Sequence, residues 1–240
     1  MAETLIALGK EVIIAGRTES SLKKAAGEIG AKAYYVLDVS DISKISGFVK
    51  EVTSKHPELD CVINNAGVQR PFQILGPDYD FDLDKADQEI NTNIRGPMHL
   101  SVLLVPHFNS KPNGGVIMNV SSVLGYNPFS LVNPVYNGTK AWVHFFTMNL
   151  RSQLRNAGSK IKVVEIVPPT VSTALHRERK DPLDNTKEHG SASALSVEEF
   201  MAEIKVGWEK DHDTCPAGLG HELVGKWYAA FNESYTKAGG

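Results

Sequence analysis

Residues 116–140 read VIMNVSSVLGYNPFSLVNPVYNGTK, an apolar run that gives way to polar residues and then to the start of a helical pattern. The run Val116–Val120 is apolar except at Asn119, as is typical of a strand covered on both faces. The segment Val135–Leu154 is long and amphipathic and predicts a helix. A buried strand followed by such a helix is a building block of an α/β fold.

The same alternation of strand and helix extends in both directions from this stretch. Short apolar runs predict strands at Glu11–Ala15, Ala33–Leu37, Cys61–Asn64 and Lys162–Val167, and amphipathic segments predict helices at Ser20–Ile29, Ser43–Lys55, Leu83–Val105, Ser196–Lys210 and Gly220–Thr236. Strands separated by helices predict a parallel sheet between two helical layers, so we expect a doubly wound, three-layer α/β fold of Rossmann type. No linker divides the chain, which indicates a single domain over residues 1–240.

Composition excludes several classes of protein. Hydrophobic residues make up 42% and charged residues 22%, which excludes a disordered, collagen-like or coiled-coil chain. A net charge of −3 gives no electrostatic support for binding to nucleic acid or to a membrane surface. No apolar run approaches the ~18 residues that a membrane span needs, and no secretory pattern opens the chain. With only Cys61 and Cys215 present, we expect a reducing, cytoplasmic location.

Tyr136 and Lys140 stand four residues apart at the start of a predicted helix. That spacing places both side chains on one helical face, with Cβ atoms about 6 Å apart. Because an ammonium beside a phenol favours the phenolate, we expect Lys140 to lower the pKa of Tyr136 toward working pH. Such a phenol can protonate a developing alkoxide or deprotonate an alcohol. Similar pairs also occur by chance on structural helices, so the neighbouring motifs decide the interpretation.

Polar residues follow three of the predicted strands. Asp38 follows the second strand, Asn64–Gly67 ends the third, and Ser122 follows Val116–Val120. Catalytic groups of open α/β sheets lie at the carboxyl ends of strands, so we expect Ser122 to polarise a substrate. The small residues Ala66 and Gly67 allow a ligand to approach the backbone closely.

Taken in order, these motifs resemble the short-chain dehydrogenase/reductase family. The matching positions are Asp38-Val39, Asn64-Asn65-Ala66-Gly67, Asn93, Ser122, Tyr136-x-x-x-Lys140 and the run from Val167 to Thr173. The resemblance covers nearly the whole chain. Within the family the chain is most similar to the bacterial and fungal DltE-like oxidoreductases, since Pro168-Pro169 stands where most relatives have Pro-Gly.

The resemblance implies an NADP(H)-dependent oxidoreductase that reduces a ketone or aldehyde, or oxidises a secondary alcohol. Tyr136 would be the general acid/base, Ser122 would stabilise charge on the substrate oxygen, and Lys140 would hold the nicotinamide ribose. Asn93 would position a water that relays protons from Lys140 to solvent. The implied cofactor-binding residues are Arg17, Asp38, Asn65, Ala66, Gly67, Tyr136, Lys140, Pro168, Val171 and Thr173.

Arg17 bears on the choice of cofactor. It follows the strand Glu11–Ala15, where an acidic residue would favour NAD. A cation with Thr18 and Ser20 nearby suits a 2′-phosphate, so we expect NADP(H), with NAD less favoured. A solvated surface arginine is the alternative interpretation.

The partners that we expect are a small carbonyl or alcohol substrate and further copies of the chain. The polar segment Thr173–Ser196 predicts a lid or substrate loop, and Gln69, Arg70, Tyr126 and Phe129 are candidate pocket residues. In the family the long helices often pack between subunits, which implies a homodimer or homotetramer. No metal site is expected, because none of the eight histidines has a metal-ligand spacing.

The front of the chain departs from the family pattern. Relatives begin with a strand, a glycine-rich turn and a helix, whereas Met1–Gly9 is similar only to the last turns of that helix, with Gly9 after its end. The family's first strand is central, so we expect two exposed strand edges and weak dinucleotide binding, as in an incomplete version of an active enzyme. Either the strands Glu11–Ala15 and Cys61–Asn64 pair directly or the fold is weakened.

Two other functions stay open at this point. A non-catalytic dimeric scaffold is favoured by the missing glycine-rich turn and disfavoured by the retained Ser122, Tyr136 and Lys140. A sugar-nucleotide epimerase or dehydratase would use the same catalytic pair, but the chain lacks the extra length that such enzymes usually have for a substrate domain.

Overall fold

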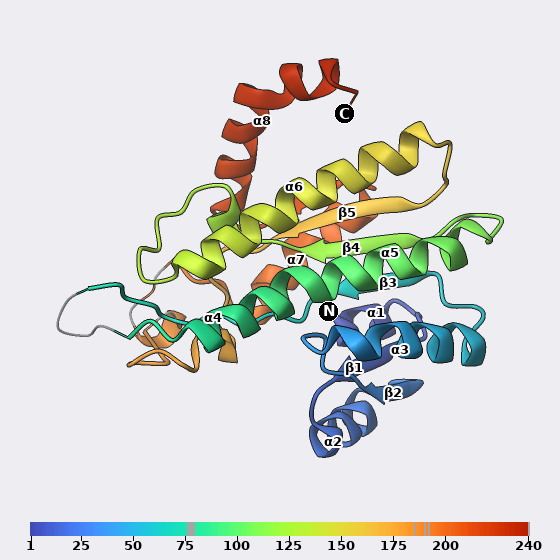
Figure 1. The fold of residues 1–240 in the computed structure, drawn as a ribbon, viewed down its shortest axis with the longest axis horizontal. Helices are drawn as coiled ribbons and strands as arrows, with labels where there is room; N and C mark the ends of the chain where they lie inside the picture. The colour runs from blue at the N-terminus through green and yellow to red at the C-terminus, as the bar shows by residue number, and fades with distance from the viewer. Residues whose placement is uncertain (76–79, 185, 190, 192, 240) are drawn as a thin grey trace.

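The computed structural model describes residues 1–75, 80–184, 186–189, 191 and 193–239. Helices and strands alternate along the chain (Figure 1). In order they are α1 (Ala2–Ala7), β1 (Ile13–Gly16), α2 (Glu19–Ile29), β2 (Ala33–Val36), α3 (Ile42–Lys55), β3 (Cys61–Asn64), α4 (Leu83–Ile90), η1 (Asn91–Arg95), α5 (Gly96–Asn109), β4 (Val116–Val120), η2 (Val123–Gly125), α6 (Pro134–Asn156), β5 (Lys162–Val167), η3 (Ala174–His176), η4 (Lys187–His189), α7 (Val197–Glu209), β6 (Thr214–Pro216) and α8 (Gly220–Lys237).

The strands form two parallel sheets. β1 pairs with β2, and the second sheet has the order β3-β4-β5-β6. Parallel strands flanked by helices confirm the predicted α/β fold. The alternative in which β1 pairs directly with β3 is wrong, because no ladder joins these strands in the described part of the chain. β1 and β3 are therefore edge strands of separate sheets.

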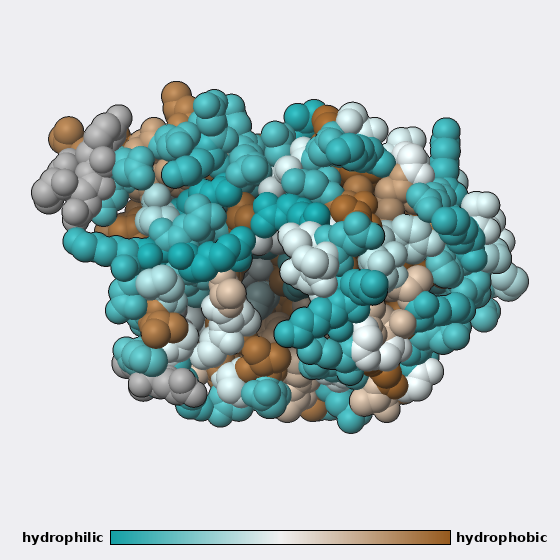
Figure 2. All heavy atoms as spheres, turned by 90° about the horizontal axis from the view of Figure 1, so that it is seen from below, coloured by the Kyte–Doolittle hydropathy of each residue, from teal (hydrophilic) through white to brown (hydrophobic). Residues whose placement is uncertain are grey.

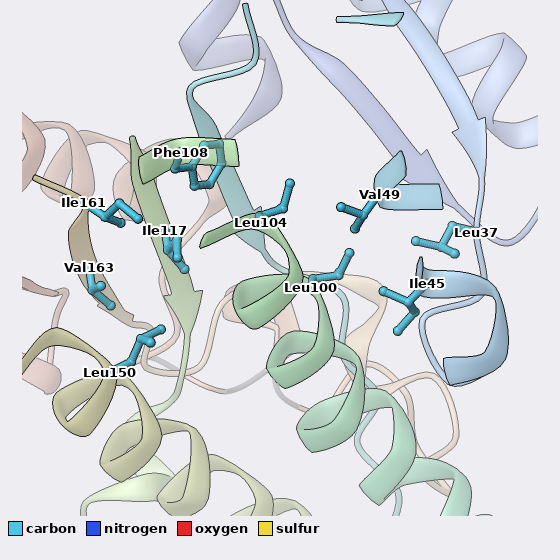
Figure 3. Packing of buried hydrophobic residues seen from close by; sticks show 10 residues of the cluster. All are labelled: Leu37, Ile45, Val49, Leu100, Leu104, Phe108, Ile117, Leu150, Ile161 and Val163. Carbon is cyan, nitrogen blue, oxygen red and sulfur yellow. The ribbon is translucent and has the colours of Figure 1, made fainter. Parts of the chain in front are cut away.

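Helix α5 joins the two sheets through a shared apolar core (Figure 3). Leu100 and Leu104 of α5 point toward Ile45 and Val49 of α3, while Phe108 lies beside Ile117 of β4. All six side chains are buried. Burial of apolar surface is the main favourable term in folding, so side-chain packing holds the sheets together where backbone hydrogen bonds do not.

The four-stranded sheet is covered on both faces. Side chains alternate along β5, so Val163 packs in the core with α5 and α6, whereas Val164 and Ile166 pack against α7. Figure 1 shows α5 and α6 in front of this sheet and α7 behind it. The largely apolar character of β5 is explained by this double burial.

The predicted helix Leu83–Val105 is interrupted. α4 passes into the π-helical turn η1, and α5 begins at Gly96 with Pro97 in its first turn. Proline has no N–H to donate to the preceding turn, so the widened turn falls where an interior proline disturbs the helix. The prediction for the N-terminal segment is confirmed, since Gly9 follows α1 with a φ of 78°, the left-handed conformation of a helix C′ position.

The face shown in Figure 2 is largely hydrophilic, with separate hydrophobic areas and a hollow near its middle. Within the described ranges, no helix is both long enough and apolar enough to cross a bilayer.

Candidate active site

The carboxyl ends of β3, β4 and β5 open onto one cavity of about 710 Å³. Ser122, Tyr136 and Lys140 all line this cavity. Open α/β sheets bind ligands outside the carboxyl ends of their strands, so the cavity has the position expected of an active site. The two strands β3 and β4 are neighbours in the sheet, which brings the loops that follow them together.

Tyr136 and Lys140 occupy the first two turns of α6, which begins at Pro134. Both side chains are buried, and the Lys140 Nζ lies 5.5 Å from the centroid of the Tyr136 ring. Lys140 Nζ donates a hydrogen bond of 2.7 Å to the Val120 carbonyl at the end of β4. The helix is thereby attached to the strand that leads to Ser122.

Ser122 begins η2 and faces Tyr136. Its Oγ accepts a hydrogen bond of 3.2 Å from the Leu124 N–H, which fixes the side chain at the start of the turn. The Ser122 hydroxyl also acts on Tyr136, where it favours the phenolate and lowers the pKa. Both side chains line the same cavity, as shared contact with one substrate oxygen requires.

Burial governs the titration of this pair. Burial raises the pKa of Tyr136 above its usual value, against the opposing effect of Ser122. Burial also lowers the pKa of Lys140 to about 8. The expectation that Lys140 lowers the pKa of Tyr136 is therefore not met here: burial has the largest effect, the Glu89 carboxyl acts in the same direction, and the Lys140 ammonium donates instead to the Val120 carbonyl.

Asn93 lies in η1, behind the cavity lining. Its Oδ1 accepts from the Val68 N–H at 2.9 Å, and its Nδ2 donates to the Val68 carbonyl at 2.9 Å and to Thr139 Oγ1 at 3.1 Å. Asn93 thus fastens the segment after β3 to α6. Its assignment to a proton-relaying water stays a prediction.

Gly67 lies between Asn93 and Lys140. A Cβ at Gly67 would lie 3.4 Å from Asn93 Oδ1 and 3.7 Å from Lys140 Nζ, so glycine leaves the space beside the lysine open. The remaining members of this wall are residues predicted to bind a cofactor, and they all line the cavity: Asn65, Ala66, Pro168, Val171 and Thr173.

Two predicted cofactor residues lie outside the lining of the cavity. Arg17 is exposed after β1, and Asp38 follows β2, where its Oδ1 accepts from the Ser40 N–H at 2.9 Å and from the Ser40 hydroxyl at 2.7 Å. Both follow strands of the two-stranded sheet. The separation of the two sheets explains why these residues, predicted from the sequence to bind the cofactor, lie outside the lining of the cavity.

The substrate side of the cavity is only partly as expected. Gln69 and Phe129 line it, whereas Arg70 and Tyr126 do not. Arg70 is used in the protein interior, where its Nε donates to Glu178 Oε2 at 2.9 Å. This ion pair ties the segment Thr173–Ser196 to the region before α4. Residues 185, 190 and 192 of that predicted lid lie outside the described residues.

Several functional neighbours carry no sequence signal. Phe200 and Met201 of α7 form an apolar wall of the cavity, and their helical spacing indicated only a core face. Glu89 of α4 is fully buried, and neither of its carboxylate oxygens has a hydrogen-bond partner among the described residues. Burial raises the pKa of Glu89 to about 8. As for metals, the structure as described gathers no group of three or more His, Cys, Asp or Glu side chains that could hold an ion.

Comparisons with known proteins agree with the geometry. The family model described as short chain dehydrogenase matches residues 1–184. The uncharacterized oxidoreductase DltE of Bacillus subtilis is 34% identical over 207 residues, which are 86% of this chain and 79% of the relative. Benzil reductase ((S)-benzoin forming) IRC24 of Saccharomyces cerevisiae is 29% identical over 188 residues, 76% of this chain and 70% of the relative.

A solved structure shows the same fold. The short-chain dehydrogenase from Sphingobium yanoikuyae in complex with NADPH superposes with a TM-score of 0.81 at 20% identity, covering 99% of this chain and 88% of the other. The match of the family model to most of the chain, together with the DltE relative, decides the assignment. The chain belongs to the short-chain dehydrogenase family of oxidoreductases.

Proposed function

We propose that the protein reduces a ketone or aldehyde with NADPH, and catalyses the reverse oxidation of a secondary alcohol, with Tyr136 as general acid/base. The observation that supports this most directly is the convergence of Ser122, Tyr136 and Lys140 on one cavity at the carboxyl ends of the strands.

The cavity fits the nicotinamide end of a dinucleotide. The open space at Gly67 adjoins Lys140, and Asn65, Pro168 and Val171 line the same cavity. When bound, the nicotinamide supplies or accepts a hydride. Lys140 would hold its ribose, with Thr173 and Ala66 as further contacts. Arg17 and Asp38 would select NADP(H) at the adenosine end, as the sequence predicts.

The chemistry of the chain's own residues favours reduction. Because burial raises the pKa of Tyr136, its hydroxyl is protonated at neutral pH and ready to act as an acid. Ser122 would donate a hydrogen bond to the substrate oxygen as negative charge develops there. Tyr136 would then protonate that oxygen, and the Lys140 ammonium would stabilise the phenolate that is left.

Apolar side chains form part of the substrate side of the cavity, beside the polar Gln69. Leu124, Phe129, Phe200 and Met201 contribute to its walls. Such walls bind uncharged carbonyl compounds with bulky apolar groups. Benzil, after which the yeast relative is named, is therefore a suitable first compound.

The proposal includes a homo-oligomer and a cytoplasmic location. Exposed apolar side chains lie on the two long helices, with Val102 and Leu103 on α5 and Phe145 on α6. Exposed large apolar side chains are enriched at subunit interfaces. Light scattering coupled to gel filtration measures the number of subunits.

The test of the function is oxidation of NADPH by the purified chain, followed at 340 nm with a panel of ketones that includes benzil. Replacement Tyr136→Phe is expected to reduce kcat at least about 100-fold, because it removes the general acid. The control Tyr34→Phe, in β2 and outside the cavity lining, should retain activity. NADPH oxidation that is unaffected by Tyr136→Phe would refute the assigned mechanism, and an inactive wild type would favour the non-catalytic scaffold.

A further inference from the structure

A buried polar cluster lies directly behind Ser122, outside the cavity. Glu165 of β5 and His144 of α6 are both fully buried, and His144 Nδ1 lies 3.0 Å from Glu165 Oε2. The Glu165 side chain lies on the same face of the sheet as Val163, and α6 covers this face. His144 stands one helical turn beyond Lys140, on the same face of α6.

Two hydroxyls from the segment that contains Ser122 donate hydrogen bonds to the Glu165 carboxylate. Ser121 Oγ donates to Glu165 Oε1 at 2.6 Å, and Tyr126 OH donates to Glu165 Oε2 at 2.9 Å. Burial, reinforced by Glu165, raises the pKa of Tyr126, so the phenol keeps its proton and stays a donor. One carboxylate therefore fixes both ends of the short segment Ser121–Tyr126.

The cluster is enclosed by aromatic side chains. The Tyr126 ring lies 4.2 Å from the His144 ring, and the Trp227 ring of α8 meets the His144 ring edge-on at 4.8 Å. In this environment the hydrogen bonds are shielded from water and from salt, so they restrain the segment more than exposed ones would.

Stability alone does not explain such a cluster. Apolar side chains of similar volume often stabilise a core as well as a buried ion pair does. A carboxylate that accepts from both sides of Ser122 instead fixes the direction of the hydroxyl between them. Lys140 adds a third attachment just before the segment, through the Val120 carbonyl.

We propose that Glu165 and His144 are positioning residues that hold the Ser121–Tyr126 segment so that the Ser122 hydroxyl stays directed at Tyr136. His144 aligns the carboxylate by donating from Nδ1, and Glu165 receives Ser121 and Tyr126. The inference rests on the proposed function, in which Ser122 and Tyr136 share the substrate oxygen.

The test compares two tyrosine variants that each lose one hydrogen-bonded hydroxyl. Tyr126→Phe removes a donor to Glu165 and keeps the aromatic ring, whereas the control Tyr35→Phe removes the hydroxyl that contacts His56 at 2.9 Å in the other sheet. Loss of one such hydrogen bond should lower kcat about 5- to 10-fold in Tyr126→Phe, with KM for NADPH unchanged. Tyr35→Phe should have wild-type kcat.

A double-mutant cycle separates positioning from a general structural role. In a Ser122→Ala background, Tyr126→Phe should have no further effect on kcat, because the hydroxyl that the cluster directs is absent. An equal fractional loss with and without Ser122 would overturn the proposal. Ser121→Ala, which removes the other donor, provides a second variant with the same expected result if Tyr126→Phe folds poorly.

Amide hydrogen exchange tests the proposal without turnover. The Leu124 and Gly125 amides donate to Ser122, so their exchange reports the order of the segment. Exchange there should accelerate at least about 5-fold in Tyr126→Phe and not in Tyr35→Phe. If the wild type reduces no carbonyl compound, the proposed function fails, while equal exchange in the two variants would still refute the positioning of this segment.

Discussion

For single residues of the cavity, burial has the largest effect on the pKa. Tyr136 and Lys140 are four residues apart, as an acid–base pair requires, yet burial shifts each of them toward its neutral form. In the poorly solvating interior of a protein, the loss of hydration of a charged group is offset only by close hydrogen-bonded partners. The spacing in the sequence reveals the pair, but the depth of the cavity sets its titration.

Glu89 is a second residue in which burial raises the pKa, here to about 8 from an ordinary value of 4.5. The charged groups that act on it are Arg70, Glu178 and Lys140. Between pH 4.5 and about 8, Glu89 keeps its proton in the native state, whereas the unfolded chain has released it. The stabilisation is therefore complete below pH 4.5 and is lost as the pH rises through about 8.

Glu89→Gln should remove this pH dependence. At pH 9 the variant is expected to exceed the wild type in free energy of unfolding by on the order of 2–5 kcal/mol, and below pH 4.5 to differ little. Urea unfolding at both pH values measures this difference, with the exposed Glu28→Gln of α2 as a control that should follow the wild type. A constant offset between Glu89→Gln and wild type at all pH values would contradict the expectation.

Among the elements, the junction of η1 and α5 depends on a glycine. A Cβ at Gly96 would lie 2.9 Å from the Val39 carbonyl oxygen and 3.0 Å from the Val39 Cβ. Val39 belongs to the chain that leaves β2, so the absence of a side chain at Gly96 lets α5 approach the two-stranded sheet.

Gly96→Ala should consequently separate α5 from Val39 and lower the free energy of unfolding by about 1–3 kcal/mol. Gly47→Ala is the matched control, because Gly47 lies inside α3 and a Cβ there would meet none of the described atoms within 4 Å. In that helix, alanine is expected to stabilise by about 0.5–1 kcal/mol. Chemical denaturation of both variants would reveal opposite signs, and equal signs would count against the close approach at Gly96.

Elements with a strong periodic pattern could be predicted from the sequence, and short or widened ones could not. Strands β3, β4 and β5 lie at their predicted positions because double burial makes them largely apolar. β6 was missed, since three residues that include Pro216 have no strand pattern. The cluster of Glu165 and His144 was missed as well, because its members come from different elements that meet only after folding.

At the scale of the whole molecule, the two sheets are joined by packing and by surface charge. Lys32 bridges Glu11 and Glu58 across the gap at 2.7 and 2.8 Å, but these groups are exposed and contribute little. The sequence could not show whether the edges of the two sheets would pair with each other. α5 packs against both α3 and β4 in one apolar core. This packing holds the two sheets in one molecule, although their edges do not pair.

This arrangement predicts that the β1–β2 sheet opens independently of the other. Ile45 of α3 and Ile204 of α7 are both fully buried, so replacing either with alanine should destabilise its surroundings by about 2–5 kcal/mol. Ile45→Ala weakens the packing of α3 against α5. Amide hydrogen exchange should therefore accelerate in β1 and β2, while β4 stays protected.

Ile204→Ala provides the matched comparison, because it removes the same atoms from the core on the opposite face of the four-stranded sheet. Exchange should then accelerate in β5 and β6, which pack against α7, and remain unchanged in β1. If Ile45→Ala instead accelerated exchange equally in β1 and β4, the two sheets would unfold as one cooperative unit. If accelerated exchange is confined to a different sheet in each variant, the packing of α5 is the chief link between the two sheets. A hydrogen-bonded ladder shared by the sheets would instead spread the effect of either substitution to both sheets.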